Sequence, residues 1–136
     1  MGLGKVTHIT VLVSDQQAAL DFYTGKLGFD KVADLNTNMG EHQMRWVTVR
    51  PQGGDGPEVA LWPASQTPGG QGTEALGKPT GITLVCTDLD STFDELGSKG
   101  VKITMPPSDV PWGRHGMFAD QDGNQIYVVQ PGQMGG

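Results

Sequence analysis

The first half of this chain is repeated in its second half at an offset of 73 residues. The segment VTHITVLVSD, which begins at Val6, is matched by TGITLVCTD, which begins at Thr80. Ile9 then corresponds to Ile82, and Asp15 corresponds to Asp88. Two copies of this length are too few and too long for a solenoid. The repeat therefore indicates a duplicated module, with one copy in each half of the chain.

Both copies predict the same order of elements. Alternating apolar residues predict a strand at the start of each copy, and an apolar stripe at helical spacing follows it. Gly28 and Gly100 are expected to end the two helices. Capping boxes are expected from Ser14 with Gln17 and from Thr87 with Asp90. The strands are predicted at 5–13, 29–35, 44–50, 58–62, 80–87, 101–105, 114–119 and 125–130, with loops at 36–43 and 106–113.

Each half thus reads βαβββ. We expect a single domain over residues 1–136, with module one at 5–62, module two at 80–131 and a linker at 63–79. The linker is rich in Gly, Pro, Ser and Thr and shows no periodicity, and it is alternatively a loop that folds over a site.

Composition narrows the class of protein. A chain of 136 residues can bury a core without disulfides, and its one cysteine, Cys86, leaves no disulfide framework to form. The formal net charge of −6 argues against a nucleic-acid partner. No leader-like segment or long apolar run is present in the sequence, so we expect a cytoplasmic protein without a membrane partner.

Three segments resemble a known superfamily. AALDFYTGKLGF at 18–29, PWG at 111–113 and DQDGNQIYVVQ at 120–130 look like the vicinal oxygen chelate superfamily. This superfamily includes glyoxalase I, extradiol dioxygenases, fosfomycin-resistance transferases and bleomycin-resistance proteins. Gln121 stands where its last hairpin usually has proline. The resemblance implies an α+β fold, in which two βαβββ modules form a curved mixed sheet with helices outside and a concave cup inside. It also implies a homodimer.

Strand alternation divides the predicted sheet residues between two faces. One face is expected to pack against the helices and carries Ile9, Val11, Ile82, Leu84, Ile126 and Val128. The other is expected to line the cup and carries His8, Thr10, Thr83, Glu58, Ala60, Trp62, Gln125 and Tyr127.

The resemblance also implies where a divalent metal would be held, by up to four ligands on the first and last strands of both modules. His8 matches the first of these positions, but its repeat equivalent, Gly81, has no side chain. Ala60 and Tyr127 occupy the two last-strand positions, and a shift of two residues would substitute Glu58 and Gln125 there. A transition ion needs at least three such donors, so we expect no metal cofactor. His8 is then expected to be hydrogen-bonded in a pocket. His42 and His115 are expected to be solvated or hydrogen-bonded surface residues, which could complete a site only through loop closure or a dimer partner.

Aromatic side chains are expected to take the place of a metal. Trp46 and Trp62 should face the cup, Trp112 should lie at its rim, and Arg114 could pair with an anionic group or stack on a ring. With Tyr127, these residues predict metal-independent binding of a small planar organic molecule, as in bleomycin-resistance-like proteins. No residue is assigned as catalytic. The alternatives are a glyoxalase-like metal-dependent lyase, isomerase or dioxygenase using His8 and Glu58, and a metal-free enzyme with one of these two as general base.

Overall fold

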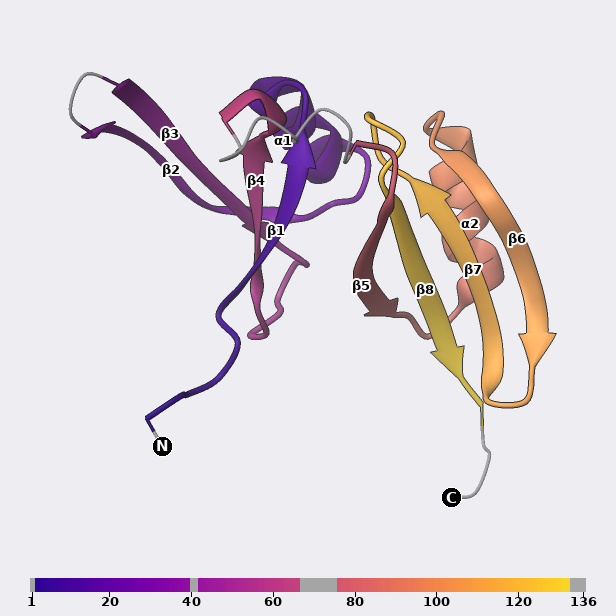
Figure 1. Cartoon of the computed structure of the whole chain (residues 1–136). Helices are drawn as coiled ribbons and strands as arrows, with labels where there is room; N and C mark the ends of the chain where they lie inside the picture. The colour runs from indigo at the N-terminus through magenta and orange to yellow at the C-terminus, as the bar shows by residue number, and fades with distance from the viewer. Residues whose placement is uncertain (1, 40–41, 67–75, 133–136) are drawn as a thin grey trace. The chain divides into compact units, whose positions relative to one another are not determined.

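The computed structural model describes residues 2–39, 42–66 and 76–132. The chain forms two compact units, Met1–Leu76 and Gly77–Gly136, which we call unit 1 and unit 2. Both units have the predicted order βαβββ (Figure 1). Unit 1 contains β1 His8–Val13, α1 Gln16–Gly25, β2 Asp30–Met39, β3 His42–Arg50, β4 Glu58–Pro63 and a 3₁₀ turn, η1, at Ala64–Gln66. Unit 2 contains β5 Pro79–Val85, α2 Leu89–Ser98, β6 Lys102–Val110, β7 Gly113–Ala119 and β8 Gln125–Pro131.

Each unit forms a four-stranded mixed sheet with the same topology. The strand order is β1-β4-β3-β2 in unit 1 and β5-β8-β7-β6 in unit 2. The first and last strands of each unit run parallel, and the remaining pairs are antiparallel hairpins. The sequence repeat is therefore a repeat of structure, and the α+β fold that the superfamily resemblance implied is confirmed.

Both helices begin one residue later than the predicted capping boxes. Asp15 caps α1 by accepting a hydrogen bond from Ala18 N at 2.8 Å, and Asp88 caps α2 by accepting one from Ser91 N at 3.1 Å. Aspartate is a strong N-cap residue because its carboxylate satisfies an amide that has no helical partner. The predicted caps at Ser14 and Thr87 were thus wrong by one residue.

The two predicted polar loops are largely strand. β2 extends to Met39 and β3 begins at His42, so only residues 40–41 of the expected loop at 36–43 lie outside the described strands. β6 continues through Pro106 and Pro107 to Val110. Proline is tolerated there because β6 is an edge strand, and the ladder register shifts between Met105 and Ser108.

Other boundaries also differ from the sequence-based expectation. β1 begins at His8 rather than at residue 5, and part of the predicted linker forms η1. Residues 67–75 of that linker lie outside the described residues.

One face of each sheet packs against its helix, and this face supplies the core. In unit 1 the buried residues of this layer are Val11, Val13, Val47, Val49, Val59 and Leu61 from the sheet and Ala19, Leu20, Phe22 and Tyr23 from α1. In unit 2 they are Ile82, Phe118, Ile126 and Val128 from the sheet and Leu89, Phe93 and Leu96 from α2. The predicted alternation is confirmed, although Ile9 and Leu84 are only half-buried. We call the opposite face of each sheet its helix-free face.

Candidate functional site

A histidine, a carboxylate and a threonine meet on the helix-free face of unit 1. The parallel pairing of β1 with β4 sets His8 directly beside Glu58. His8 Nε2 lies 3.6 Å from Glu58 Oε2, and their side chains are 36% and 22% exposed. Thr48 on β3 is fully buried and donates a hydrogen bond from Oγ1 to Glu58 Oε1 at 2.7 Å. Thr48 therefore fixes one carboxylate oxygen of Glu58, and the other oxygen faces the imidazole of His8.

Apolar side chains share this face with the polar group. The Trp46 ring lies edge-on to the His8 ring, with ring centroids 5.5 Å apart. Leu35 on β2 pairs with Trp46 in the hairpin and is 56% exposed. Register also places Thr10 opposite Ala60 and Leu12 opposite Trp62 on this sheet, and alternation along β4 puts Trp62 on the same face as Glu58. Five of the predicted site residues thus share one face: His8, Thr10, Trp46, Glu58 and Trp62.

A second aromatic group lies on the helix-free face of unit 2. His115 on β7 and Tyr127 on β8 are joined by a hydrogen bond of 2.7 Å between Nδ1 and Oη, and their ring centroids are 5.4 Å apart. The Trp112 ring also lies edge-on to the imidazole, at 6.2 Å between centroids. Trp112 is 51% exposed. His115 therefore brings together two predicted site residues, Trp112 and Tyr127, and it is hydrogen-bonded, which is one of the two states expected for it.

Arg114 lies on the helix side of unit 2 and so is separated from this group. Alternation along β7 puts it on the face of Phe118, which is packed against α2. Its Nη1 donates to Asp109 Oδ1 at 2.6 Å, and its Nη2 donates to Asp90 Oδ1 of α2 at 2.9 Å. Hydrogen bonds to these two carboxylates raise the pKa of Arg114 above its usual value. The anionic groups that Arg114 meets are thus aspartates of its own unit.

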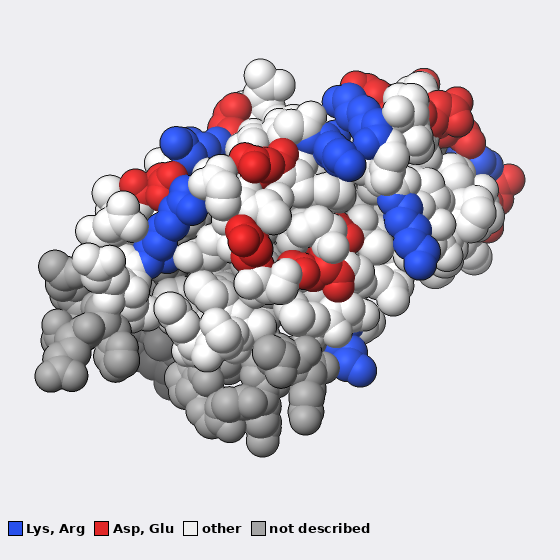
Figure 2. Space-filling view, turned by 90° about the horizontal axis from the view of Figure 1, so that it is seen from above, with Lys and Arg blue, Asp and Glu red and all other residues white. Residues whose placement is uncertain are grey.

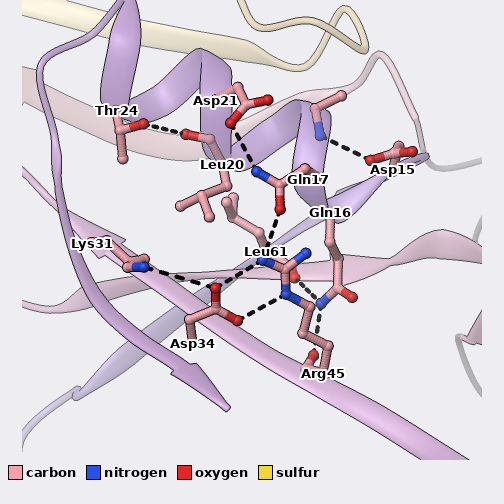
Figure 3. A network of polar contacts seen from close by, with 11 residues as sticks. Asp15, Gln16, Gln17, Leu20, Asp21, Thr24, Lys31, Asp34, Arg45 and Leu61 are labelled. Carbon is pink, nitrogen blue, oxygen red and sulfur yellow. Dashed lines mark hydrogen bonds and ion pairs between the residues drawn. The ribbon is translucent and has the colours of Figure 1, made fainter. Parts of the chain in front are cut away.

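The same arrangement is present in unit 1 around Arg45 (Figure 3). Arg45 makes two hydrogen bonds of 2.8 Å to the carboxylate of Asp34 on β2, and its Nη2 donates to Gln17 of α1 at 2.9 Å. The paired guanidinium lowers the pKa of Asp34. Gln17 and Asp90 occupy equivalent places in the repeat. Arg45 and Arg114 therefore have the same role, which is to tie helix, inner strand and edge strand together.

The side chains present do not fit a metal site of the kind implied by the superfamily. His8 and Glu58 are two potential donors, but Gly81 has a φ of 79° and no side chain, and Tyr127 is bonded to His115. Within the described residues, no three His, Cys, Asp or Glu side chains come together. Two donors leave a transition ion short of the three or four protein ligands that hold it firmly.

Charged groups of both signs are interspersed on the face drawn in Figure 2, and the Lys and Arg side chains seen there form separate small areas. Among the described helices, none has the length and apolarity needed to cross a bilayer.

Two residues of these faces could not be identified from the sequence. Leu35 joins the first group only because the β2–β3 hairpin pairs it with Trp46, and His115 joins the second because β7 pairs beside β8. Strand-to-strand register is set by pairing between distant segments, and single-strand alternation does not reveal it.

Comparison with known proteins agrees with this architecture. A structure described as a member of the glyoxalase/bleomycin resistance protein/dioxygenase superfamily from Sphaerobacter thermophilus is 41% identical, covers 96% of this chain and 99% of its own, and superposes with a TM-score of 0.82. TnmS3, described as an antibiotic binding protein from Streptomyces sp. CB03234, is 36% identical with a TM-score of 0.74, over 97% of this chain and 99% of its own. The uncharacterised protein YetH of Bacillus subtilis is 32% identical over 93% of this chain and 98% of its own length.

The sequence profile of one family matches residues 5–128, which include every strand and both helices except the end of β8. On this match, the chain belongs to the Glyoxalase/Bleomycin resistance protein/Dioxygenase superfamily.

Proposed function

We propose that this protein binds a small planar organic molecule without a metal. The observation that carries the proposal is the contact of Trp46 with His8. At the position where the superfamily resemblance implies a metal ligand, an indole ring packs against the imidazole, and the neighbouring carboxylate is bonded to Thr48. Aromatic side chains bind flat ligands well because stacking contributes about 0.5–1.5 kcal/mol per ring pair beyond the area buried.

The similarity to TnmS3 supports the same proposal. That protein is described as antibiotic binding, and the alignment spans nearly the whole of both chains. We accordingly propose an antibiotic or an aromatic metabolite as the ligand class. The further binding residues that we propose are Thr10 and Trp62 on the face of unit 1 and, on the face of unit 2, Trp112 and Tyr127. We also propose that the protein acts as a cytoplasmic homodimer, as the superfamily resemblance implies.

Tryptophan quenching by a panel of planar antibiotics and metabolites tests this function. Trp62→Ala should weaken a genuine ligand by about 1–3 kcal/mol because it removes a ring-sized contact surface. Trp62→Phe should retain most of the affinity, since a smaller ring still stacks. Leu3→Ala is the matched control, because Leu3 is 84% exposed and precedes the first strand. A panel without any saturable ligand, or hits unaffected by Trp62→Ala, would contradict the proposal.

The closeness of His8 to Glu58 favours one competing function, a metal-dependent lyase, isomerase or dioxygenase. Their 3.6 Å separation would suit two ligands of one ion. Elemental analysis of untagged protein, purified without chelators, separates the two functions. Near-stoichiometric Ni, Zn, Fe or Mn that is lost in His8→Ala would support the enzyme and exclude the metal-free binder.

A further inference from the structure

Two neighbouring side chains, Tyr127 and Trp112, contact the His115 ring. Tyr127 Oη hydrogen-bonds Nδ1 at 2.7 Å, the phenol ring stands at 84° to the imidazole, and the Trp112 ring stands at 79° to it. A ring fixed in this way has already lost most of its rotamer freedom. It can therefore contact a ligand at little further entropic cost.

This polar pair is specific to unit 2. Thr48 pairs with Ala60 in unit 1, and Met117 pairs with Tyr127 in unit 2. Tyr127 therefore takes the place of Ala60, and Met117 that of Thr48. Two residues before these on β7 and β3, His115 takes the place of Trp46. The same backbone therefore presents an indole beside a methyl group in one unit and an imidazole bonded to a phenol in the other.

The chemistry of the pair lies in the second ring nitrogen. Within the described part of the chain, His115 Nε2 makes no hydrogen bond, while Nδ1 is bonded to Tyr127. When the Tyr127 hydroxyl donates to Nδ1, the proton of a neutral imidazole is on Nε2, which is then a donor. When Nδ1 carries the proton and donates to Oη, Nε2 is an acceptor. Tyr127 can thus serve either tautomer without losing its hydrogen bond.

We propose that His115 Nε2 is a hydrogen-bonding point for a ligand on the helix-free face of unit 2 and that it selects planar aromatic ligands with a hydroxyl or carbonyl group on the ring. Tyr127 is a positioning residue, which orients the imidazole and accommodates its tautomer. This inference rests on the proposed binding function and adds the ligand's polar group to it.

Calorimetric titration with 2-naphthol and 2-methylnaphthalene tests the inference at neutral pH on the full chain. The two probes have the same shape, and the hydrocarbon is the more hydrophobic. Simple burial therefore favours 2-methylnaphthalene, whereas a hydrogen bond worth about 1 kcal/mol favours 2-naphthol by about fivefold. We expect the native protein to prefer 2-naphthol, His115→Phe to bind the hydrocarbon but lose this preference, and His115→Gln to retain part of it.

Nitrogen-15 NMR of the histidines gives a second readout that does not depend on a variant folding. Adding 2-naphthol should shift the Nε2 resonance of His115, and Tyr127→Phe should change the balance between its Nε2 and Nδ1 signals. Equal affinities for both probes, or a preference for the hydrocarbon, would overturn the inference and leave the binding function standing. Failure of both probes to bind would also overturn it, and the antibiotic panel would then decide the fate of the binding function separately.

Discussion

Gly116 on β7 has no room for a side chain, and this gives a sharp test of the packing in unit 2. A Cβ at this position would lie 2.5 Å from Cε2 and 2.7 Å from Cζ of Phe93, and 3.1 Å from the carbonyl oxygen of Met105. Carbon atoms pack at about 3.5–4.0 Å, so the phenyl ring would have to move by roughly an ångström. Phe93 is itself 4% exposed and packs edge-on to Phe118, so the ring has little space to move into.

The expected cost of Gly116→Ala follows from two opposing effects. Replacing glycine within a strand reduces the entropy of the unfolded chain and should stabilise the fold by roughly 0.5–1 kcal/mol. Overpacking a filled core costs about 1–3 kcal/mol. Overpacking should win, so the variant should lose about 1–2 kcal/mol of unfolding free energy, measured as a lower midpoint in urea at an unchanged m-value.

Unit 1 shows how the same position is filled when its partner is smaller. Val47 and Leu20 are the repeat equivalents of Gly116 and Phe93, and both are buried. Adding Phe93→Leu to Gly116→Ala should therefore recover stability relative to the sum of the two single changes, with a coupling of about 1 kcal/mol. Gly116→Ala as stable as the native protein, or strictly additive effects in the double variant, would refute this packing argument.

Three further expectations concern single residues. The hydrogen bonds from Arg45 lower the pKa of Asp34 from its usual 3.8, so the ion pair stabilises the fold above that pH and its contribution is lost as the pH falls through the lower folded pKa. Asp34→Asn should therefore cost about 1 kcal/mol of unfolding free energy at neutral pH and make stability depend less on pH in acid. An acid-unfolding curve with the same pH dependence as that of the native protein would argue against the pair. Gly113 has a φ of 140°, and a Cβ there would overlap the carbonyl oxygen of Gln130. Gly113→Ala should therefore lower the urea midpoint by more than Gly25→Ala, whose Cβ meets open space. Equal midpoints would contradict this backbone conformation at Gly113. Burial raises the pKa of the Cys86 thiol, so alkylation by iodoacetamide at neutral pH should be much slower than for the urea-unfolded chain, and equal rates would mean that the thiolate is not disfavoured.

The order of elements and the two sheet faces were predictable because the repeat supplies the same evidence twice. Ile82 and Val11 both follow strand alternation, and both are buried. The sequence failed where local composition opposed tertiary pairing. Pro106 and Pro107 are typical of loops, yet edge strand β6 accepts them because an edge has one side without ladder partners.

The sequence predicted which residues share a face of the sheet, but only some of the contacts between their side chains. Alternation correctly placed His8, Glu58 and Trp46 on one face of unit 1. It did not reveal that His115 bonds Tyr127, because that contact depends on the pairing of two strands. Nor did it place Arg114 opposite Asp90, since the partner lies on a helix 24 residues earlier in the chain.

Arg45 and Arg114 have a consequence for anyone who wants to alter what this protein recognises. On the helix-free faces, equivalent positions of the two units differ chemically: Trp46 corresponds to His115, and Ala60 corresponds to Tyr127. On the helix side, by contrast, both units have the same arginine, hydrogen-bonded to an aspartate on the edge strand. A grafted or transplanted half should therefore carry its arginine, its aspartate and the first turn of its helix as one inseparable part, while the recognition surface on the other side is redesigned.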